Sequence, residues 1–520
     1  MRELGRLVPS ACGSLWELIE ARAAATPDAV FALDELGRTM RFGAFKDSVL
    51  AMAAGLLGVG VEPGSRVAWQ LPTWLETATL AGALDRLGAV QVPVLPMLRR
   101  RELEFMVAEA EVATIAVPRV WNGFDHLALA CDVASATGSG TVVVDRDGEL
   151  PAGDPATLPA ARPRPDDETT WIFYTSGTTS DPKGVRHGHR AVLASSEAMC
   201  DRMQIVDTDR SVVAFPLTHI GGINWLMTSM LTGCSLLLIE RFAHPDTMPL
   251  IQRSGVTLAG VTTAFHQVYL AAQREDPDTP LLPEVRAYPG GAAPKPPALH
   301  HALVEEVGGV GIVSGYGLTE HPMVAMSSVD DPTNALATTE GHPSTGVQLD
   351  VVDPETGRAC PPGYDGEFRL RGPHLMLGYV DESLHEYAFD DAGRFRTGDL
   401  GHLDADGRVV VTGRLKDVIV RKGENISAQE IENLLHDLDE VTEAAVVGVP
   451  DAERGERVGA VVVPAVGADI GLDTLCTALR ARDLTVQKLP EALLLVDELP
   501  RSPTGKIRKD ELRTLFAESL

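Results

Sequence analysis

Apolar residues recur at helical spacing in several segments near the start of the chain, with short apolar runs between them. Residues three and four apart share one helix face, so this spacing predicts helices over 15–25, 45–55, 77–87 and 101–110. The runs between them are rich in Val, Ile, Leu and Ala and predict strands at 66–70, 114–117 and 141–144. Alternation of this kind is typical of α/β layers around a partly parallel sheet.

The pattern changes twice further along the chain. A proline-rich stretch over 151–165 predicts an exposed connection, after which strands and helices alternate again over 171–313. Beyond Leu349, short apolar runs separated by Pro-Gly and Asp-Gly turn signals predict a small β-rich subdomain over about 345–413.

The last part of the chain predicts a compact α+β unit of its own. Ser427 and Glu430 have the spacing of a capping box, which opens a helix reaching about residue 438. Strands are expected at 444–449, 457–463 and 493–496, and a second helix at 472–482. We therefore expect an α/β fold with a large N-terminal domain over 1–415 and a small α+β C-terminal domain over 416–520.

Charge and cysteine usage exclude several classes of protein. The formal net charge of −28 argues against nucleic acids and anionic membranes, which bind clustered Lys and Arg. The six cysteines form no CxxC or Cys/His group, so neither a metal site nor a disulfide framework is expected. The N-terminal segment lacks the apolar core of a signal peptide, and the most apolar stretch, 71–96, is interrupted by proline and charged residues. We expect a cytoplasmic protein with no integral membrane association.

A loop rich in Gly, Ser and Thr is the first candidate for chemistry. The run Tyr-Thr-Ser-Gly-Thr-Thr-Ser-Asp-Pro-Lys-Gly at 174–184 follows a strand-like apolar run. Its N–H groups and hydroxyls can bind phosphate oxygens, and Lys183 adds a positive charge. It is not a Walker A loop, because Lys183 is followed by glycine rather than Ser or Thr. By composition alone, a flexible surface turn is an equal alternative.

As an ordered string, 174–184 resembles the signature of the adenylate-forming superfamily, which includes acyl-CoA synthetases, firefly luciferase and peptide-synthetase adenylation domains. Ser180 departs from it, where the family usually has glycine. Other segments match family motifs in the same order: Tyr-Pro-Gly-Gly-Ala-Ala-Pro at 288–294, Gly-Tyr-Gly-Leu-Thr-Glu at 315–320, Arg-Thr-Gly-Asp at 396–399, Gly-Arg-Leu-Lys-Asp at 413–417 and Pro-Arg-Ser-Pro-Thr-Gly-Lys at 500–506. The resemblance covers nearly the whole chain and implies a C-terminal domain that moves.

The resemblance also implies a site for ATP. The residues that would contact the nucleotide are Thr175, Ser176, Gly177, Thr178, Thr179 and Lys183 at the phosphates, Gly291, Ala292, Tyr316 and Gly317 at adenine, Thr319 at the α-phosphate, and Asp399 and Arg414 at the ribose. Glu320 would help hold Mg²⁺, a hard ion that prefers oxygen ligands shared with phosphates. For the glycines near 290, an ordinary turn is the alternative.

The same resemblance implies how the reaction is divided. Lys506 would bridge the acyl carboxylate and the α-phosphate, where a cation stabilises the growing charge. Glu320, Thr175 and His219 complete the expected catalytic set. Lys416 occupies the hinge position, which requires free backbone torsions rather than a special side chain. Gly423 would leave room for the pantetheine arm of coenzyme A, with a turn glycine as the alternative.

The identity of the acid depends on softer signals. His219, in Pro-Leu-Thr-His-Ile-Gly-Gly at 216–222, occupies the position that gates the family's acyl pocket, although a packed core histidine is the alternative. The pocket lining is expected from Gly222, Trp225, Phe265, Tyr288 and Leu318, with Thr263 and Ser314 nearby. No Asp or Lys occurs among them, which favours an acid with an apolar body. Segments 93–97, 101–105 and 123–126 resemble cyclohexanecarboxylate–CoA ligases and related actinobacterial fatty-acid–CoA ligases, which implies a medium-chain or alicyclic acid.

Two other functions remain as alternatives. An acyl-AMP ligase would load a carrier protein instead of coenzyme A, but no carrier attachment motif follows Lys506, so coenzyme A is the expected acceptor. A non-catalytic scaffold would predict a broken site, whereas Glu320, Asp399, Arg414 and Lys506 are all present. The expected partners are a carboxylic acid, ATP and coenzyme A, and a homodimer is left open.

Overall fold

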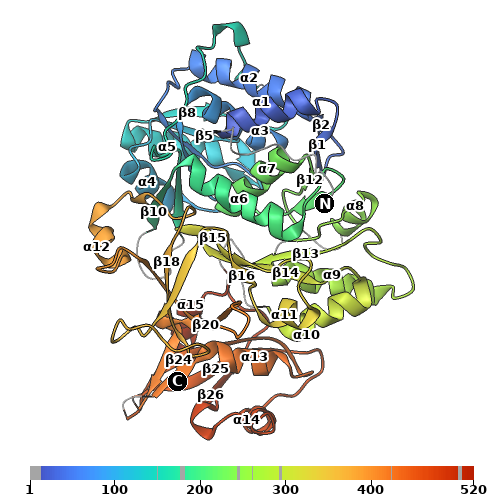
Figure 1. Ribbon diagram of the computed structural model, residues 1–520, viewed down its shortest axis with the longest axis vertical. Helices are drawn as coiled ribbons and strands as arrows, with labels where there is room; N and C mark the ends of the chain where they lie inside the picture. Colours follow the sequence, from blue (N-terminus) through green and yellow to red (C-terminus); the bar gives the residue numbers. More distant parts are fainter. Residues whose placement is uncertain are drawn as a thin grey trace.

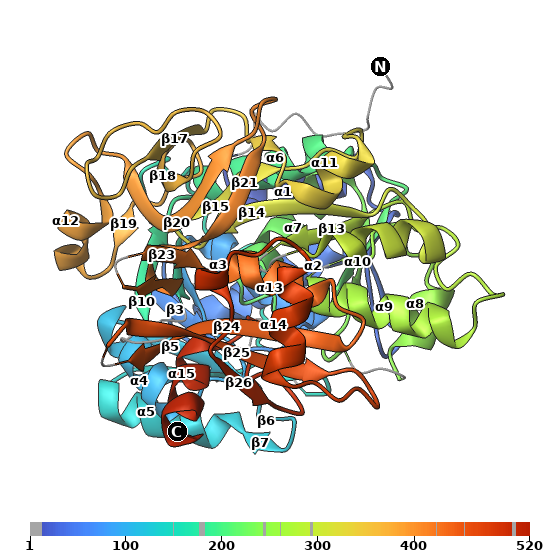
Figure 2. The same ribbon diagram turned by 90° about the horizontal axis from the view of Figure 1, so that it is seen from below.

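The computed structural model describes residues 13–148, 150–175, 182–242, 246–260, 262–291, 295–422, 424–451, 453–501 and 506–519. A large N-terminal region, blue to light orange in Figure 1, lies above a smaller C-terminal region in deeper orange and red. Seen from below, the C-terminal elements lie across the N-terminal region (Figure 2).

A seven-stranded sheet in the order β19-β10-β9-β4-β3-β5-β8 forms the first layer. Strands β9, β4, β3, β5 and β8 are parallel, whereas β10 runs antiparallel to both β9 and β19. The strands are β3 (Arg66–Trp69), β4 (Val90–Pro93), β5 (Thr114–Val117), β8 (Gly140–Val143), β9 (Trp171–Thr175), β10 (Lys183–His187) and β19 (Gly378–Tyr379).

Helices cover both faces of this sheet. Val67 and Trp69 of β3 pack in one hydrophobic cluster with helices α1 to α3, while Ala68 between them packs in another with α4 and α5. This alternation follows from the two-residue period of a strand. The helices are α1 (Leu15–Ala25), α2 (Phe42–Gly58), α3 (Leu75–Leu87), α4 (Arg100–Glu109) and α5 (His126–Thr137).

Two further sheets complete the α/β part of the N-terminal region. The first has the order β11-β12-β1-β2 and the second β13-β14-β15-β16. Their strands are β1 (Val30–Asp34), β2 (Thr39–Arg41), β11 (Arg210–Val213), β12 (Ser235–Leu238), β13 (Tyr288–Gly291), β14 (Ile312–Leu318), β15 (His321–Met326) and β16 (His342–Pro343). The accompanying helices are α6 (His189–Met203), α7 (Ile220–Thr232), α8 (Met248–Arg253), α9 (Thr263–Glu275), α10 (Pro297–Ala302) and α11 (Thr333–Thr338), and a short ribbon pairs β6 (Val120–Trp121) with β7 (Phe124–Asp125).

An antiparallel sheet, β17-β18-β20-β21, forms the β-rich part that the turn signals predict. It comprises β17 (Gln348–Val352), β18 (Gly366–Arg371), β20 (Phe395–Leu403) and β21 (Val409–Arg414), with the short α12 (His385–Ala388) beside it. Phe368 and Leu370 of β18 pack in one cluster with Tyr316 of β14 and Tyr379 of β19. A shared core therefore joins this sheet to the seven-stranded sheet and to the sheet that contains β14.

The C-terminal region is built on one sheet, β23-β22-β25-β24, with β26 paired to β25. Its strands are β22 (Val418–Arg421), β23 (Glu424–Ser427), β24 (Val441–Asp451), β25 (Gly455–Pro464) and β26 (Ala492–Leu495), and its helices are α13 (Ala428–His436), α14 (Leu472–Arg480) and α15 (Lys509–Ser519). Alternate residues of β24 serve different cores, Val446 packing with α13 and α14 and Val447 with α15.

The expected fold class is confirmed, and most of the predicted elements occur within a few residues of their expected bounds. Ser427 caps α13 by accepting a hydrogen bond from the N–H of Glu430, as the capping box predicts. The proline-rich stretch at 151–165 is largely exposed and contains only a short 3-10 turn, Pro155–Thr157. None of the helices, so far as they are described, is long and apolar enough to cross a membrane.

Candidate active site

The glycine-rich loop closes a hairpin between two strands of the large sheet. Thr175 at the end of β9 pairs with Lys183 at the start of β10, and Tyr174 pairs with Gly184. Both ends of the loop are therefore fixed by an antiparallel ladder. The predicted phosphate contacts Ser176, Gly177, Thr178 and Thr179, and the unusual Ser180, lie outside the described residues.

Glu320 lies in the two-residue turn that joins β14 to β15. The hydroxyl of Tyr379 donates a hydrogen bond of 2.8 Å to Oε1 of Glu320, and the N–H of Met376 donates to the carbonyl of Glu320 at 2.9 Å. The ammonium of Lys183 lies 5.7 Å from the centroid of the Tyr379 ring. The loop lysine and the turn carboxylate are thus both neighbours of one tyrosine.

A buried histidine, His187, holds the turn that carries Thr319 and Glu320. Nε2 of His187 in β10 donates to the carbonyl of Thr319 at 2.7 Å. Burial lowers the pKa of His187 to about 4, so the ring is neutral at pH 7. Gly317 allows the strands to close here, because a Cβ at that position would lie 2.1 Å from the carbonyl oxygen of Pro322.

Tyr316, Asp399 and Arg414 form a connected polar group between two sheets. The Tyr316 hydroxyl donates to Oδ2 of Asp399 at 2.7 Å, and Nε of Arg414 lies 2.8 Å from Oδ1 of the same carboxylate. Asp399 and Arg414 are directly opposite each other on β20 and β21, and Asp399 is only 2% exposed. The charge of Asp399 in turn raises the pKa of Arg414.

The strand predicted to lie beside adenine approaches its neighbour closely. Gly291 at the end of β13 pairs with Gly315 of β14, and a Cβ on Gly291 would lie 2.7 Å from the Gly315 carbonyl oxygen. Glycine is therefore required at Gly291 for packing alone. Ala292, the next predicted contact, lies outside the described residues.

Lys506 brings the C-terminal region into this group. It is partly buried, and its pKa is lowered first by desolvation and then by the positive charge of Arg414. Asp399 and Glu320 act in the opposite direction, raising its pKa. These couplings put the ammonium among the charged groups of the N-terminal region, although Lys506 is about 90 residues beyond Arg414 in sequence.

His219 is the N-cap of α7, and its Nδ1 accepts a hydrogen bond of 3.1 Å from the N–H of Gly221. Desolvation, and after it the charge of Lys506, lowers the pKa of His219 to about 4. The imidazole is therefore neutral at pH 7. With Nδ1 accepting, the proton is on Nε2, and His219 is held by its helix end within electrostatic reach of Lys506.

The residues expected to line the acyl pocket are divided among different cores. Trp225 is buried in the cluster of α1 to α3, Phe265 and Tyr288 belong to the cluster around α9, and Leu318 packs against that of the β-rich sheet. Gly222 has a packing reason of its own, because its Cβ would lie 2.5 Å from Cα of Leu217.

The hinge candidate Lys416 lies in a short 3-10 turn, Leu415–Asp417, between β21 and β22. It is exposed, whereas the strands on either side belong to different sheets. Ser427 Oγ donates to the carbonyl of Thr412 across this connection at 2.8 Å. Gly423, the expected position beside pantetheine, lies outside the described residues.

The donor set at Glu320 is compatible with Mg²⁺. Over the described ranges, no group of three or more His, Cys, Asp or Glu side chains is placed to hold a metal ion by itself. A single carboxylate suits Mg²⁺, which keeps several waters and is bound largely through substrate phosphates. One Glu320 oxygen accepts from Tyr379, and the second is available for such an ion.

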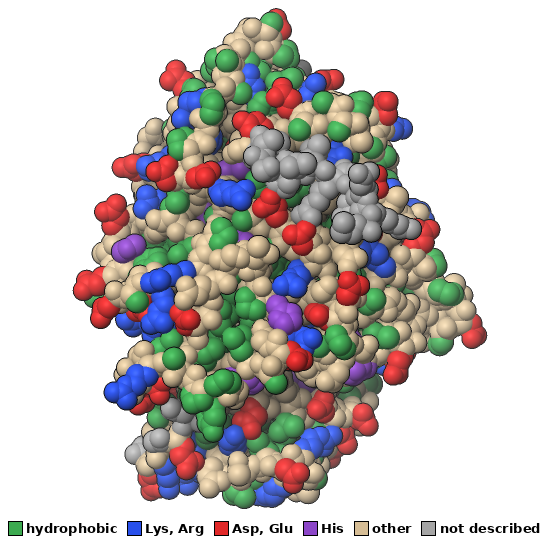
Figure 3. Space-filling view, viewed as in Figure 1, with side chains coloured by type: hydrophobic (Ala, Val, Ile, Leu, Met, Phe, Trp, Pro, Cys, Tyr) green, Lys and Arg blue, Asp and Glu red, His purple; other side chains and the backbone are tan. Residues whose placement is uncertain are grey.

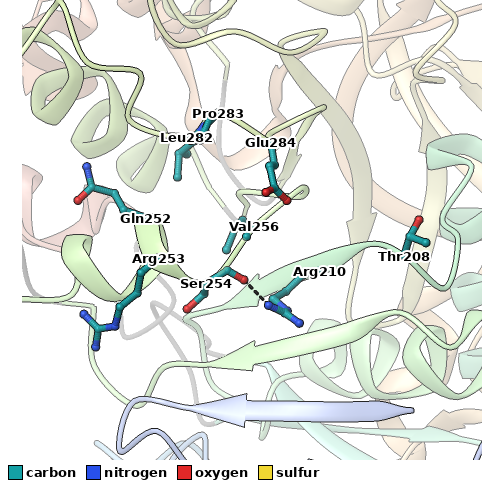
Figure 4. Close-up of a pocket in the computed structure, with 10 residues that line it drawn as sticks. Thr208, Arg210, Gln252, Arg253, Ser254, Val256, Leu282, Pro283 and Glu284 are labelled. Atoms are coloured by element: carbon teal, nitrogen blue, oxygen red, sulfur yellow. Dashed lines mark hydrogen bonds between the residues drawn. The ribbon is translucent and has the colours of Figure 1, made fainter.

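A separate surface hollow of about 420 Å³ lies beside α8 (Figure 4). It contains none of the predicted site residues, and Arg210 within it donates to the carbonyl of Ser254 and, at 2.9 Å, to the hydroxyl of Ser235. Acidic and basic side chains are interspersed over the face drawn in Figure 3, without a basic tract on the described part of that face.

Sequence reasoning missed two side chains that the structure brings to the site. Tyr379 is not among the predicted site residues, and only its hydrogen bond to Glu320 shows that it belongs to the site. His187 carries no signal at all in the sequence, because only the pairing of β9 with β10 and the fold of β14 bring it to Thr319.

Comparison with known proteins gives a consistent result. The family model for AMP-binding enzymes matches residues 19–380, and the model for their C-terminal domain matches residues 430–506. The chain is 30% identical over 514 residues to the medium-chain fatty-acid–CoA ligase of Escherichia coli (strain K12), covering 96% of this chain and 90% of that protein. It is 34% identical over 487 residues to a salicylyl-CoA synthase / salicylate adenylyltransferase from a Streptomyces species, covering 90% and 87%.

Among solved structures, ATP-bound MatB from Rhodopseudomonas palustris superimposes on the chain with a TM-score of 0.89 at 26% sequence identity. The match covers 98% of this chain and 99% of that one. The similarity therefore extends through both regions and is not confined to the nucleotide motifs.

Proposed function

The chain belongs to the family of AMP-binding enzymes, and we propose that it joins a mainly apolar carboxylic acid, medium-chain or alicyclic, to coenzyme A. The general activity, that of an ATP-dependent, AMP-forming acyl-CoA ligase, follows from the family and from relatives named as CoA ligases or synthases, which the chain matches along nearly their whole length. The proposal adds the class of acid, the acceptor and the role of each residue.

The observation that carries the proposal is the convergence of Lys506 with Glu320, Asp399 and Arg414. The charges of Glu320, Asp399 and Arg414 all act on the Lys506 ammonium, and Tyr316 is hydrogen-bonded to Asp399. Asp399 is buried, whereas Glu320 and Lys506 are partly buried and Arg414 is exposed. A packed scaffold has no need to gather such charges beside a buried carboxylate, because a buried charge costs free energy unless it is paired. An anionic substrate explains this arrangement, because Lys506 and Arg414 can neutralise different parts of its charge.

In the first half-reaction, a carboxylate oxygen of the acid attacks the α-phosphorus of ATP, and the bond from that phosphorus to pyrophosphate breaks. Lys506 lies between the carboxylate and the α-phosphate and stabilises the negative charge that grows there. Asp399 accepts from the ribose hydroxyls, and Tyr316 stacks on adenine. Thr175 and Lys183 contact the phosphates from the two ends of the β9–β10 hairpin.

Glu320 would hold Mg²⁺, which would supply positive charge against the phosphates. The chain's own contribution is to hold that carboxylate in a two-residue turn supported by Tyr379 and Met376. His219, neutral at pH 7 and fixed at the start of α7, adds no charge beside the incoming acid and gates the acyl pocket.

In the second half-reaction, the coenzyme A thiol attacks the acyl carbon of the acyl-AMP, and AMP leaves. The domains divide at residues 415 and 416, and rotation about Lys416 withdraws Lys506 and brings the segment around Gly423 to the site. Support comes from the short, exposed 3-10 turn at Lys416, where torsions can change without breaking a strand.

The acid is proposed to have an apolar body because the pocket candidates Trp225, Phe265, Tyr288 and Leu318 carry no charge. The name of the Escherichia coli relative supports a medium-chain fatty acid, and the name of the Streptomyces relative makes salicylate a necessary comparison. The cytoplasm, where ATP and coenzyme A occur together, is the proposed site of action.

The test is a pyrophosphate-release assay with a panel of acids, run with and without coenzyme A. We expect the highest kcat/KM for C6–C10 or alicyclic acids, and formation of the acyl-CoA with AMP. A preference for salicylate would overturn the proposed acid class. Pyrophosphate exchange without any thioester, together with acylation of an added carrier protein, would replace coenzyme A by the carrier as acceptor.

A further inference from the structure

We propose that Tyr379 is a positioning residue that keeps the Glu320 carboxylate directed towards the magnesium nucleotide. This inference rests on the proposed function, in which Glu320 helps hold magnesium and Lys183 contacts the phosphates. Tyr379 itself touches neither the acid nor the reacting phosphorus in this assignment.

The first support is that one short segment holds Glu320 at two points. The Tyr379 hydroxyl donates to Oε1 at 2.8 Å, and the Met376 N–H donates to the Glu320 carbonyl at 2.9 Å. Tyr379 is 5% exposed and packs in the core of the β-rich sheet. Its backbone is also fixed, because it pairs with Val185 on β10. The phenol therefore approaches Glu320 from a rigid position.

The second support is the place of Lys183. Its ammonium lies 5.7 Å from the centroid of the Tyr379 ring, while the hydroxyl of the same ring holds Glu320. The π face of the ring interacts favourably with the ammonium, at a distance close to the limit of about 6 Å for such contacts. Tyr379 is thus a neighbour of both charged groups, and its hydroxyl is bonded to the carboxylate.

The chemistry of the phenol suits this task. A phenol hydroxyl is protonated at neutral pH, so it remains a donor to Glu320. It occupies one acceptor site on Oε1, and a carboxylate has about four such sites on its two oxygens. Oε2 is thereby left for a metal ion. Tyr379→Phe would keep the ring and remove only the hydroxyl that orients the Glu320 carboxylate.

The experiment compares wild type with Tyr379→Phe, and uses Tyr387→Phe as the matched control because Tyr387 is 77% exposed. Thermal unfolding is followed at fixed concentration of a non-hydrolysable ATP analogue while Mg²⁺ is titrated. We expect the Mg²⁺ concentration at half-maximal stabilisation to rise about tenfold to a hundredfold in Tyr379→Phe, as for loss of a hydrogen bond to a charged group. The control, the KM for the acid and the Tm without ligand should stay unchanged.

A double-mutant cycle with Glu320→Gln tests whether the tyrosine acts through the glutamate. If it does, adding Tyr379→Phe to Glu320→Gln raises the Mg²⁺ requirement no further. Full additivity would overturn the inference, as would a Tyr379→Phe variant with a lower Tm and an unchanged Mg²⁺ requirement.

The proposed role of Glu320 and the positioning role of Tyr379 can be tested separately. If Glu320→Gln itself leaves the Mg²⁺ requirement unchanged, the proposed role of Glu320 is wrong and the inference falls with it. If Glu320→Gln raises the requirement and Tyr379→Phe does not, the proposed function stands and only the positioning role of Tyr379 is overturned.

Discussion

The two regions of the molecule contribute to the candidate site in different ways. In the N-terminal region, Tyr316, Asp399 and Arg414 come from three strands and are tied by contacts of 2.7 to 2.8 Å. Glu320 is held as firmly, by Tyr379. The C-terminal region contributes Lys506, which follows the last strand of its sheet and precedes α15. One region is preorganised, and the other delivers a single cation to it.

The connection between the regions fits this difference. Ser427 Oγ of the C-terminal region donates to the carbonyl of Thr412 across the 3-10 turn at 415–417, whereas Arg513 of α15 lies 3.1 Å from Asp417 within the C-terminal region itself. A single hydrogen bond contributes only about 1 kcal/mol. Breaking the bond between Ser427 and Thr412 therefore costs little when the turn changes.

The largest effect is expected from removing the delivered cation. Lys506→Ala should lower acid-dependent ATP–pyrophosphate exchange about a hundredfold to a thousandfold, because the charge growing on the α-phosphate loses its counter-ion. Thioester formation from added acyl-AMP should be retained. Lys488→Ala is the control, since Lys488 is in the same region and pairs with Glu430 at the surface. Equal loss of both half-reactions would contradict the division between the regions.

Within the preorganised region, tight backbone packing should be sensitive to a single methyl group. Gly222→Ala puts a Cβ 2.5 Å from Cα of Leu217, a backbone atom that cannot move aside, and should lower the free energy of unfolding by about 1–3 kcal/mol. Gly221→Ala is the matched control, because its nearest neighbour is the His219 side chain at 3.2 Å. Urea unfolding monitored by fluorescence measures both, and equal stability of the two variants would refute the packing account.

Buried neutral histidines of the N-terminal region should make stability depend on pH. Burial lowers the pKa of His266 to about 3, below the value of about 6.5 expected in an unfolded chain. The unfolded chain then binds more protons, so the free energy of unfolding falls as pH decreases from 6.5 towards 3. His266→Gln should reduce this fall by up to about 1.4 kcal/mol per pH unit. The exposed His301→Gln serves as the control substitution, and identical slopes for both variants would contradict the assignment.

The smallest effect is expected at the contact between the regions. Ser427 Oγ donates to the Thr412 carbonyl and also accepts from the Glu430 N–H as the N-cap of α13. Ser427→Ala should cost about 1 kcal/mol in thermal unfolding. Ser427→Asp keeps the cap and loses the donation to Thr412, so it separates the two roles. If Ser427→Asp were as stable as wild type, the inter-region bond would contribute nothing.

The motifs were predictable because they are local strings. Tyr316 with Glu320, and Arg414 with Lys416, lie within a few residues of each other, and family resemblance assigns them without any knowledge of the fold. Helices and strands were predictable for a similar reason. The helix α1 and the strand β5 occur at the expected residues, because the periodicity of apolar residues is a local property. The pocket lining was harder, since proximity to a motif does not say which core Trp225 or Tyr288 will join.

By itself, the sequence determined the α/β class, the order of the elements, the family and the residue types available for the chemistry. Only the tertiary structure decided that Tyr379 holds Glu320, that His187 supports Thr319, and that Lys506 lies within electrostatic range of Asp399. The physical reason is that these contacts join groups far apart along the chain. Their formation depends on the register of β10 against β9 and β19, and on the packing of one region against the other, which no local pattern of residues encodes.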